Sequence, residues 1–289
     1  MPVSIDVAVT RWSICGEGPV WDDARGLIYW VDINGRAILT TDYATLATTQ
    51  IDYPSDVGAA AHHANGGFVA AVATGFVRIN EDGTVGHRVD CLTPELRMND
   101  AKTDRQGRLW SGSCTYDFVA GTGALWKLDG QGVATQVLDG FTLPNGLDWS
   151  PDGSWFYLVD SIRRIVLKYP FDAETGTVVN TPVELIGAEN FSALPDGLTV
   201  DSDGNLWIAE YAGSAVHQFS PNGELLRSIA MPTKFPTSCA FAGPNLDELW
   251  VTSAALEANP ETDPLAGSLF RITGLNAVGM PATAYSGTL

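Results

Sequence analysis

The sequence predicts an all-β protein folded as a six-bladed β-propeller. Three observations support this prediction: a turn-plus-strand pattern recurs along the chain, the repeats are roughly 40–50 residues apart, and convincing long helices are absent. Units of this length with about four strands each are typical of propellers, in which each blade buries its faces against its neighbours. Thirty glycines and sixteen prolines supply the turns between strands.

One aromatic residue marks each repeat, in a short apolar strand that follows a turn containing Asp or Gly. In chain order the six strands are "ARGLIYWVDI" (24–33), "NGGFVAAVAT" (65–74), "RQGRLWSGS" (105–113), "DGSWFYLVDS" (152–161), "DGNLWIAEY" (203–211) and "LDELWVTSA" (246–254). Their marker residues are Trp30, Phe68, Trp110, Phe156, Trp207 and Trp250. An N-terminal strand within "IDVAVTRW" is expected to complete the last blade and close the ring. We therefore predict a single domain over residues 1–289.

The composition excludes several classes of partner. The net charge is −18, and 16 Lys and Arg residues are too few for a nucleic-acid surface or for an anionic membrane. No window is apolar over the ~18 residues of a membrane span, and the start lacks a basic region followed by an apolar one, so a cytoplasmic protein is expected. The four cysteines are widely spaced, which argues against zinc ribbons and redox motifs. The sequence shows no sign of an obligate protein partner.

Polar residues recur at one phase of the repeat. Counting back 11 residues from three markers gives Asn99, Asn145 and Asp196, whereas a count of 13 from Trp30 gives Glu17 and a count of 12 from Trp250 gives Ser238. Equivalent positions in successive blades lie at equal height, so the side chains expected to face one another at one mouth of the central channel are Glu17, Asn99, Asn145 and Asp196. The alternative is that Asn-Gly and Asp-Gly are ordinary turn dipeptides.

Two carboxylates and two amide oxygens, without His or Cys, form a donor set suited to a hard cation. Calcium is the expected ion, with magnesium, manganese or zinc as alternatives. Other motifs do not fit: "DSDGN" (201–205) lacks the spacing of an EF-hand loop, and the chain has no G-x-S-x-G nucleophile elbow and no phosphate-binding loop.

The spaced motifs "GEGPVW" (16–21), "RMNDAKTDRQGRLWSGS" (97–113), "NGLDWSPDG" (145–153), "PDGLTVDSDGNLWIAEY" (195–211), "TSCAFAGPNLDELWVTSA" (237–254) and "GSLFRITGL" (267–275) resemble the regucalcin/senescence-marker/gluconolactonase family. The resemblance covers essentially the whole chain and implies a six-bladed, divalent-metal-dependent lactonase acting on sugar lactones. It implies metal ligation by Glu17, Asn145 and Asp196, and substrate contacts by Arg97, Asn99 and Asp117. The resemblance therefore changes the expected role of Asn99 from a direct metal ligand to a contact with substrate or water.

The resulting hypothesis is hydrolysis of a sugar lactone with one divalent ion as cofactor. Such an ion polarises a carbonyl and lowers the pKa of bound water. Asp196 is the candidate general base and Arg97 the group that orients substrate oxygens. Two alternatives share the site: a non-catalytic calcium-binding or regulatory protein, and a metal-dependent esterase or phosphotriesterase. A fold alone does not choose among them.

Overall fold

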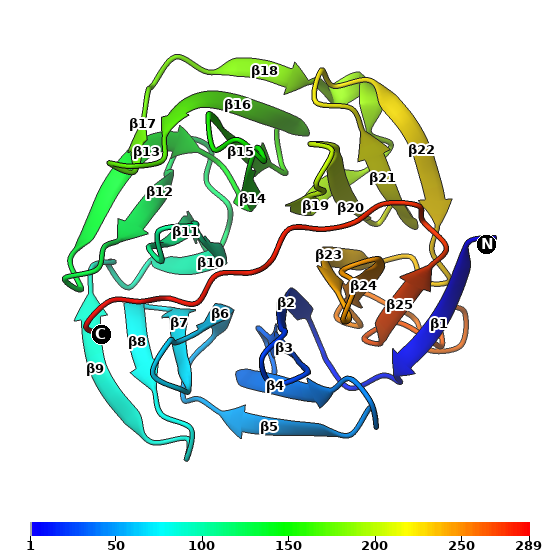
Figure 1. Ribbon diagram of the computed structural model, residues 1–289, viewed down its shortest axis with the longest axis horizontal. Coiled ribbons are helices and arrows are strands. Elements are labelled where there is room, and N and C mark those ends of the chain that lie inside the picture. Colours follow the sequence, from blue (N-terminus) through cyan, green and yellow to red (C-terminus); the bar gives the residue numbers. More distant parts are fainter. Residues whose placement is uncertain (1) are drawn as a thin grey trace.

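Six antiparallel sheets surround a central axis in the computed structural model, which describes residues 2–289 (Figure 1). From the innermost strand outward, the first three are β2–β5 (Gly16–Asp22, Leu27–Asp32, Ala37–Asp42, Thr48–Asp52), β6–β9 (Val57–His62, Phe68–Val72, Gly75–Ile79, Val85–Asp90) and β10–β13 (Leu96–Thr103, Leu109–Thr115, Gly123–Leu128, Ala134–Phe141). The next two are β14–β17 (Pro144–Trp149, Trp155–Asp160, Ile165–Asp172, Thr177–Val178), with β18 (Val183–Ile186) also beside β16, and β19–β22 (Leu194–Val200, Leu206–Tyr211, Ala215–Phe219, Leu225–Ala230). The predicted all-β, six-bladed propeller is confirmed.

The last blade is completed by the N-terminal strand, as the sequence predicted. It consists of β23 (Pro236–Ala242), β24 (Glu248–Ser253), β25 (Leu269–Thr273) and β1 (Ser4–Val9). β1 runs antiparallel to β25, with Ser4 opposite Thr273 and Val7 opposite Phe270. The innermost strands touch in ring order, and β23 contacts β2. The two ends of the chain therefore close the ring within one sheet.

The six aromatic markers all lie on the second strand of their blades, and all are buried. They form the core between blades. Trp110 of β11, for example, packs edge-on against Trp149 of the next blade, with ring centroids 6.1 Å apart. Aromatic rings bury more area than other side chains and dominate such cores. This explains why one aromatic per repeat was a usable signal in the sequence.

Each innermost strand has one register irregularity at the same height. The regular pairing is interrupted between Glu17 and Val20, Val57 and Ala59, Met98 and Ala101, Pro144 and Leu147, Pro195 and Leu198, and Pro236 and Cys239. A β-bulge bends its strand and re-aims side chains. The repeated irregularity thus directs one set of side chains towards the channel.

The C-terminal segment, residues 275–289, crosses one end of the ring and is red in Figure 1. It bridges to two separate blades, with Gly279 opposite Asp201 and Tyr285 opposite His63. Tyr285 is fully buried, and its Oη donates a hydrogen bond to the Asp129 carbonyl oxygen at 2.7 Å. The sequence did not predict this crossing. It covers one end of the channel, so the two ends differ.

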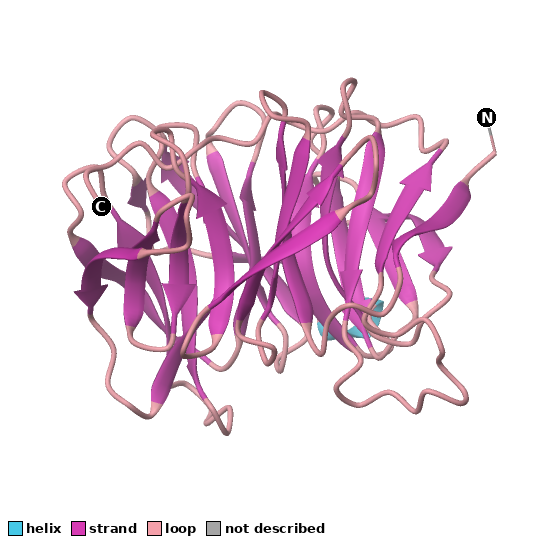
Figure 2. Cartoon of the chain, turned by 90° about the horizontal axis from the view of Figure 1, so that it is seen from below, coloured by secondary structure: helices cyan, strands magenta, loops and turns pink. Residues whose placement is uncertain are grey.

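The other end carries the loops that lead into the innermost strands. The one helical element of residues 2–289, the 3-10 turn η1 (Ala188–Asn190), lies in the loop before β19 and is cyan in the side view of Figure 2. Across the described chain, no helix has both the length and the apolar character needed to span a bilayer.

Candidate metal centre

The register irregularities bring the phased polar residues into one cavity. Five of the six blades place a polar side chain at this irregularity of the innermost strand. Asn99, Asn145, Asp196 and Thr237 come directly after the last regular pair, and Glu17 lies in that pair, opposite Val31. All five line a cavity of about 380 Å³ at the end of the channel away from the C-terminal segment. The sixth blade has Gly58 there, because a Cβ would collide with the backbone of Met98 and Asn99.

Ser238 is the exception to the phasing of the sequence. It lines a small, separate cavity of about 20 Å³, whereas its neighbour Thr237 lines the large one. Thr237 stands 13 residues before its marker, the same count that located Glu17, so the count of 12 was one residue off. The Thr237 hydroxyl contacts the Gly16 carbonyl oxygen at 2.5 Å and Thr252 Oγ1 at 2.8 Å. Its hydroxyl is therefore engaged within the fold.

A directed chain of hydrogen bonds orders the amide side chains. Arg97 Nη1 donates to Asn99 Oδ1 at 2.7 Å, and Asn99 Nδ2 donates to Asn145 Oδ1 at 2.8 Å. Asn145 Nδ2 in turn donates to Ser161 Oγ at 3.0 Å. An amide oxygen has two lone pairs, so Asn145 Oδ1 keeps one for a further partner. The amide oxygen of Asn99 already faces a guanidinium cation, which makes it a poorer cation ligand.

The two carboxylates are buried without a compensating cation in contact. Glu17 is 6% and Asp196 7% exposed, and Asp196 Oδ1 has no hydrogen-bond partner. One Glu17 oxygen accepts only the Gly18 N–H, at 2.9 Å. Burial raises the pKa of both carboxyl groups well above their usual range; repulsion from Asp196 adds to the pKa of Glu17, and repulsion from Asp100 adds to that of Asp196.

This arrangement fits a divalent cation. A buried carboxylate oxygen without a partner is costly unless a positive charge meets it, and Glu17, Asp196 and the free lone pair of Asn145 offer three oxygen donors of the kind hard cations prefer. Within residues 2–289, no three His, Cys, Asp or Glu side chains gather as a metal-binding group. The candidate centre therefore depends on the amide oxygen as its third donor.

A second set of carboxylates, which the sequence analysis missed, holds the backbone ahead of each candidate ligand. Asp32 accepts the N–H groups of the residues at positions 14 and 15 at 2.8 and 2.9 Å, ahead of Glu17. Asp160 accepts those at 142 and 143 at 3.1 and 3.2 Å, ahead of Asn145, and Glu210 accepts that at 193 at 2.7 Å, ahead of Asp196. The signal was present in the sequence, because each of the three follows its marker aromatic by two to four residues.

Arg97 lines the cavity with its candidate partner Asn99, but Asp117 does not. Asp117 is exposed, and its neighbours Tyr116 and Phe118 line the cavity instead. Phe118 has a left-handed backbone with φ of 54°, which a bulky residue adopts only under constraint. Of the six candidate residues other than Ser238, the structure thus brings five together in the cavity and leaves Asp117 outside; the five are Glu17, Arg97, Asn99, Asn145 and Asp196.

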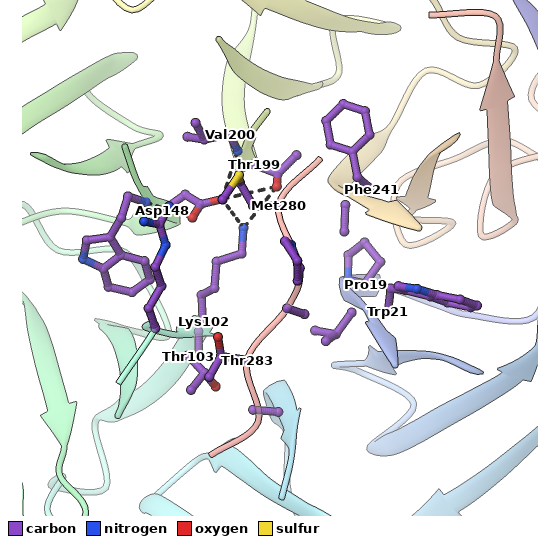
Figure 3. Close-up of a pocket in the computed structure, with 18 residues that line it drawn as sticks. Pro19, Trp21, Lys102, Thr103, Asp148, Thr199, Val200, Phe241, Met280 and Thr283 are labelled. Atoms are coloured by element: carbon purple, nitrogen blue, oxygen red, sulfur yellow. Dashed lines mark hydrogen bonds and ion pairs between the residues drawn. The ribbon is translucent and has the colours of Figure 1, made fainter. Parts of the chain in front are cut away.

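The opposite end of the channel holds a smaller cavity of about 80 Å³ beneath the C-terminal segment (Figure 3). Lys102 Nζ donates there to Asp148 Oδ2 at 2.6 Å, to the Leu198 carbonyl oxygen at 3.2 Å and to Thr199 Oγ1 at 3.3 Å. The ammonium group is thus saturated by acceptors of the protein itself. We regard this end as a structural closure and the larger cavity as the candidate site.

Several known proteins are similar to this chain in sequence and in fold. The sequence model of the SMP-30/gluconolactonase/LRE-like region matches residues 15–255. The chain is 33% identical to regucalcin of Oryctolagus cuniculus, over 99% of each chain. It is 32% identical to a protein of Bacillus subtilis (strain 168) named provisionally as the sugar lactone lactonase YvrE, over 89% of this chain and 90% of that one. The solved structure of a calcium-binding protein, regucalcin, from Agrobacterium tumefaciens str. C58 superposes with a TM-score of 0.92 at 26% identity, covering 96% of each chain.

Proposed function

This chain belongs to the SMP-30/gluconolactonase/LRE-like family, and from that premise we propose that it is a divalent-metal-dependent hydrolase of sugar lactones. The observation that carries the proposal is the unpartnered, buried Asp196 Oδ1 beside the Asn145 amide oxygen and the Glu17 carboxylate. The named relatives support it, because one is a lactonase by name and another is described as calcium-binding. Calcium is the first candidate for the ion, with zinc, manganese and magnesium as alternatives.

The charge of the cavity favours an uncharged substrate. Its described lining contains four carboxylates, those of Glu17, Asp56, Asp196 and Glu257, and one guanidinium, that of Arg97. Even with a divalent cation bound, the sum of these formal charges does not become positive. A phosphorylated or carboxylated lactone would therefore meet repulsion at the mouth, whereas a neutral lactone would not.

We assign separate roles in ester hydrolysis to the residues of the cavity. Glu17, Asn145 and Asp196 would hold the cation, which when bound supplies Lewis-acid stabilisation of negative charge on a carbonyl oxygen. Asp196 Oδ1, which has no hydrogen-bond partner within the protein, is the proposed general base that accepts the proton of the attacking water. Arg97, held by Asn99, orients substrate oxygens within the cavity.

The decisive experiment is pH-stat hydrolysis of D-glucono-δ-lactone and related aldonolactones by protein treated with a chelator. Ca²⁺, Zn²⁺, Mn²⁺ or Mg²⁺ is then added back singly, and turnover is compared with the chelated protein and with the spontaneous rate. Turnover that depends on an added ion is expected. Equal rates with and without every ion would contradict the metal dependence.

A second candidate function is cation binding without catalysis, which the regucalcin relatives favour. The same experiment separates the two when it is paired with calorimetric titration of the chelated protein. Tight ion binding without hydrolysis of any lactone in the panel would replace the proposed hydrolase with this alternative.

A further inference from the structure

The carboxylate that supports Asp196 differs from the other two backbone-holding carboxylates of the site. Each of the three lies opposite the residue that directly precedes a candidate ligand. Asp32 and Asp160 each accept two N–H groups from the segment ahead of that ligand, whereas Glu210 accepts one, through Oε1. The second oxygen of Glu210 faces His217 Nε2 at 2.9 Å. Because a carboxylate can only accept, Nε2 donates, and the histidine takes the place of the missing backbone donor.

His217 stands at a position that holds a leucine in the other two blades. In each of the three blades the carboxylate pairs with a residue of the third strand, and the residue two places further along that strand lies diagonally across from it on the same face. In chain order these diagonal positions hold Leu39, Leu167 and His217. A polar side chain therefore occurs beside the one carboxylate of the three that lacks a second backbone donor.

The Glu210–His217 pair holds three successive residues of the segment that leads into β19. The Phe191 ring, 4% exposed, packs edge-on against the His217 ring with centroids 6.2 Å apart. Ser192 Oγ donates to the Glu210 carboxylate at 3.1 and 3.2 Å, and the Ala193 N–H donates to it at 2.7 Å. The backbone just ahead of the candidate ligand in β19 is thus fixed by this pair.

The pair is anchored at the outer edge of the same blade. His217 Nδ1 lies 2.8 Å from Ser228 Oγ, and Ser228 is directly opposite His217 on β22. Strands β19 to β22 succeed one another from the axis outward (Figure 1), so these polar contacts cross the blade, with His217 8% and Glu210 2% exposed. Hydrolases with a nucleophilic serine use a similar order of residues, but Ser228 is exposed on the outer strand and lines none of the three cavities described above. We therefore treat Ser228 as an anchor.

We propose that His217 is a positioning residue for Asp196: through Glu210 it fixes the segment 191–193 and so the place at which the Asp196 carboxylate meets the cation. The proposal rests on the proposed function, because it takes Asp196 as a metal ligand. His217 does not line the candidate cavity, so it acts without touching ion or substrate. Removing a residue that orients a metal ligand typically weakens metal binding about 10–100-fold.

Two substitutions separate the hydrogen bond to Glu210 from the rest of the side chain. In His217→Gln the amide nitrogen stands as many bonds from Cβ as Nε2 does, so it can still donate to Glu210. In His217→Asn the amide group reaches only the place of Nδ1, beside Ser228, and the hydrogen bond to Glu210 is lost. The chelator-treated proteins are titrated calorimetrically with Ca²⁺, Zn²⁺, Mn²⁺ or Mg²⁺ singly. For each ion that the wild type binds, Kd is expected to be about 10–100-fold weaker in His217→Asn and within about threefold of the wild type in His217→Gln.

Two further variants complete the test. His217→Leu, which copies the leucines of the other two blades, is a second variant without the donor and should match His217→Asn in Kd. Thermal unfolding in chelator verifies that each variant is folded; a merely structural role of His217 would lower Tm without separating His217→Gln from the other two in Kd. Ser228→Ala should leave both Kd and the turnover of D-glucono-δ-lactone within about twofold, because water can replace the exposed hydroxyl.

The outcomes separate this inference from the function on which it rests. Weaker ion binding in His217→Asn and His217→Leu that His217→Gln restores supports the inference. Wild-type affinity in all three variants, or an equal loss in all three, would overturn the positioning role and leave the metal site standing. Loss of turnover in Ser228→Ala at unchanged ion affinity would replace it with a nucleophilic serine. A wild type that binds none of the four ions would end the proposed function and this inference together.

Discussion

The substitution Asp196→Asn separates two effects of this buried carboxylate: the free energy of folding that its burial costs, and its proposed role in binding the metal ion. The substitution keeps the size of the side chain and removes a charge that is 7% exposed and has one oxygen without a hydrogen-bond partner. Burial and repulsion from Asp100 disfavour the charged carboxylate, and a neutral amide of the same size avoids both costs. Leaving a buried group unpaired costs about 1–3 kcal/mol, and more when the group is charged, so removal of the charge is assigned about this amount. The metal-free Asp196→Asn protein is therefore expected to be more stable than the metal-free wild type by roughly this amount, which raises Tm by about 2 °C or more per kcal/mol.

With metal present the wild type regains about 2.3 kcal/mol on the variant, so the order of stability reverses wherever the metal-free advantage of the variant is smaller than this. At an ion concentration of 100 times Kd, binding stabilises the wild type by about 2.7 kcal/mol. Changes to groups that merely support a ligand weaken metal binding about 10–100-fold, so loss of the charged ligand itself is expected to weaken it at least 100-fold. The same ion concentration would then stabilise the variant by about 0.4 kcal/mol.

Thermal unfolding with chelator and with each ion measures both effects in the same samples. The matched control is Asp203→Asn, which removes a carboxylate from an exposed turn at the far end of β19 and should change neither quantity. A variant that gains as much stability as the wild type from the ion would refute the assignment of Asp196 as a ligand. A variant without lactonase activity but with full ion-induced stabilisation would leave only its role as a base.

Three further substitutions test other parts of the structure. Burial raises the pKa of Asp100 from 3.8 to about 6, so the native state binds a proton more tightly than the unfolded state, and the stability of the metal-free protein falls as the pH rises from about 4 to 6. Asp100→Asn removes this loss, so it should add on the order of 3 kcal/mol to the free energy of unfolding above pH 6 and nothing below pH 4. Urea unfolding at a series of pH values measures the difference. Asp160→Ala leaves the buried N–H groups of Thr142 and Leu143 without an acceptor, which should cost about 2–4 kcal/mol of unfolding free energy and weaken ion binding about 10–100-fold, measured by denaturation and calorimetry. Tyr285→Ala should cost about 3–5 kcal/mol in denaturation but leave the calorimetric Kd of the ion unchanged, because Tyr285 is buried at the opposite end of the channel.

The fold was predictable because each propeller blade repeats the same pattern of buried residues, and this pattern recurs at a regular interval in the sequence. Each blade needs a large buried ring on its second strand, and that ring appears in the sequence at a regular interval. The same regularity located the polar residues Glu17, Asn99, Asn145 and Asp196, because a bulge at a constant height lies a nearly constant number of residues before the marker. The count failed only at Ser238, where the distance between bulge and marker is two residues longer than in the three central blades.

The parts that escaped the sequence are those built from irregular loops. Whether Asp117 or its neighbours Tyr116 and Phe118 face the cavity depends on a left-handed residue and on hydrogen bonds to Thr115, and neither follows from spacing. The crossing of the C-terminal segment depends on contacts such as that between Tyr285 and Asp129, which are far apart in the sequence. Long-range pairing of this kind has no period that a single sequence could display.

The Asn-Gly and Asp-Gly pairs show why a local motif needs its structural setting. Both pairs lie inside strands, in β14 and β19, and not in turns. The glycine after Asn145 is required because a Cβ there would collide with the backbone of Asp196 and Leu198 in the next blade. The residue before each glycine is not restricted in this way. At position 145 the side chain both donates and accepts: Asn145 Nδ2 donates to Ser161 Oγ, and Asn145 Oδ1 accepts from Asn99. A carboxylate could not make the donated hydrogen bond. Asp196 makes no such donated hydrogen bond, so of these two residues it is the one that we propose to carry the charge for cation binding and proton transfer.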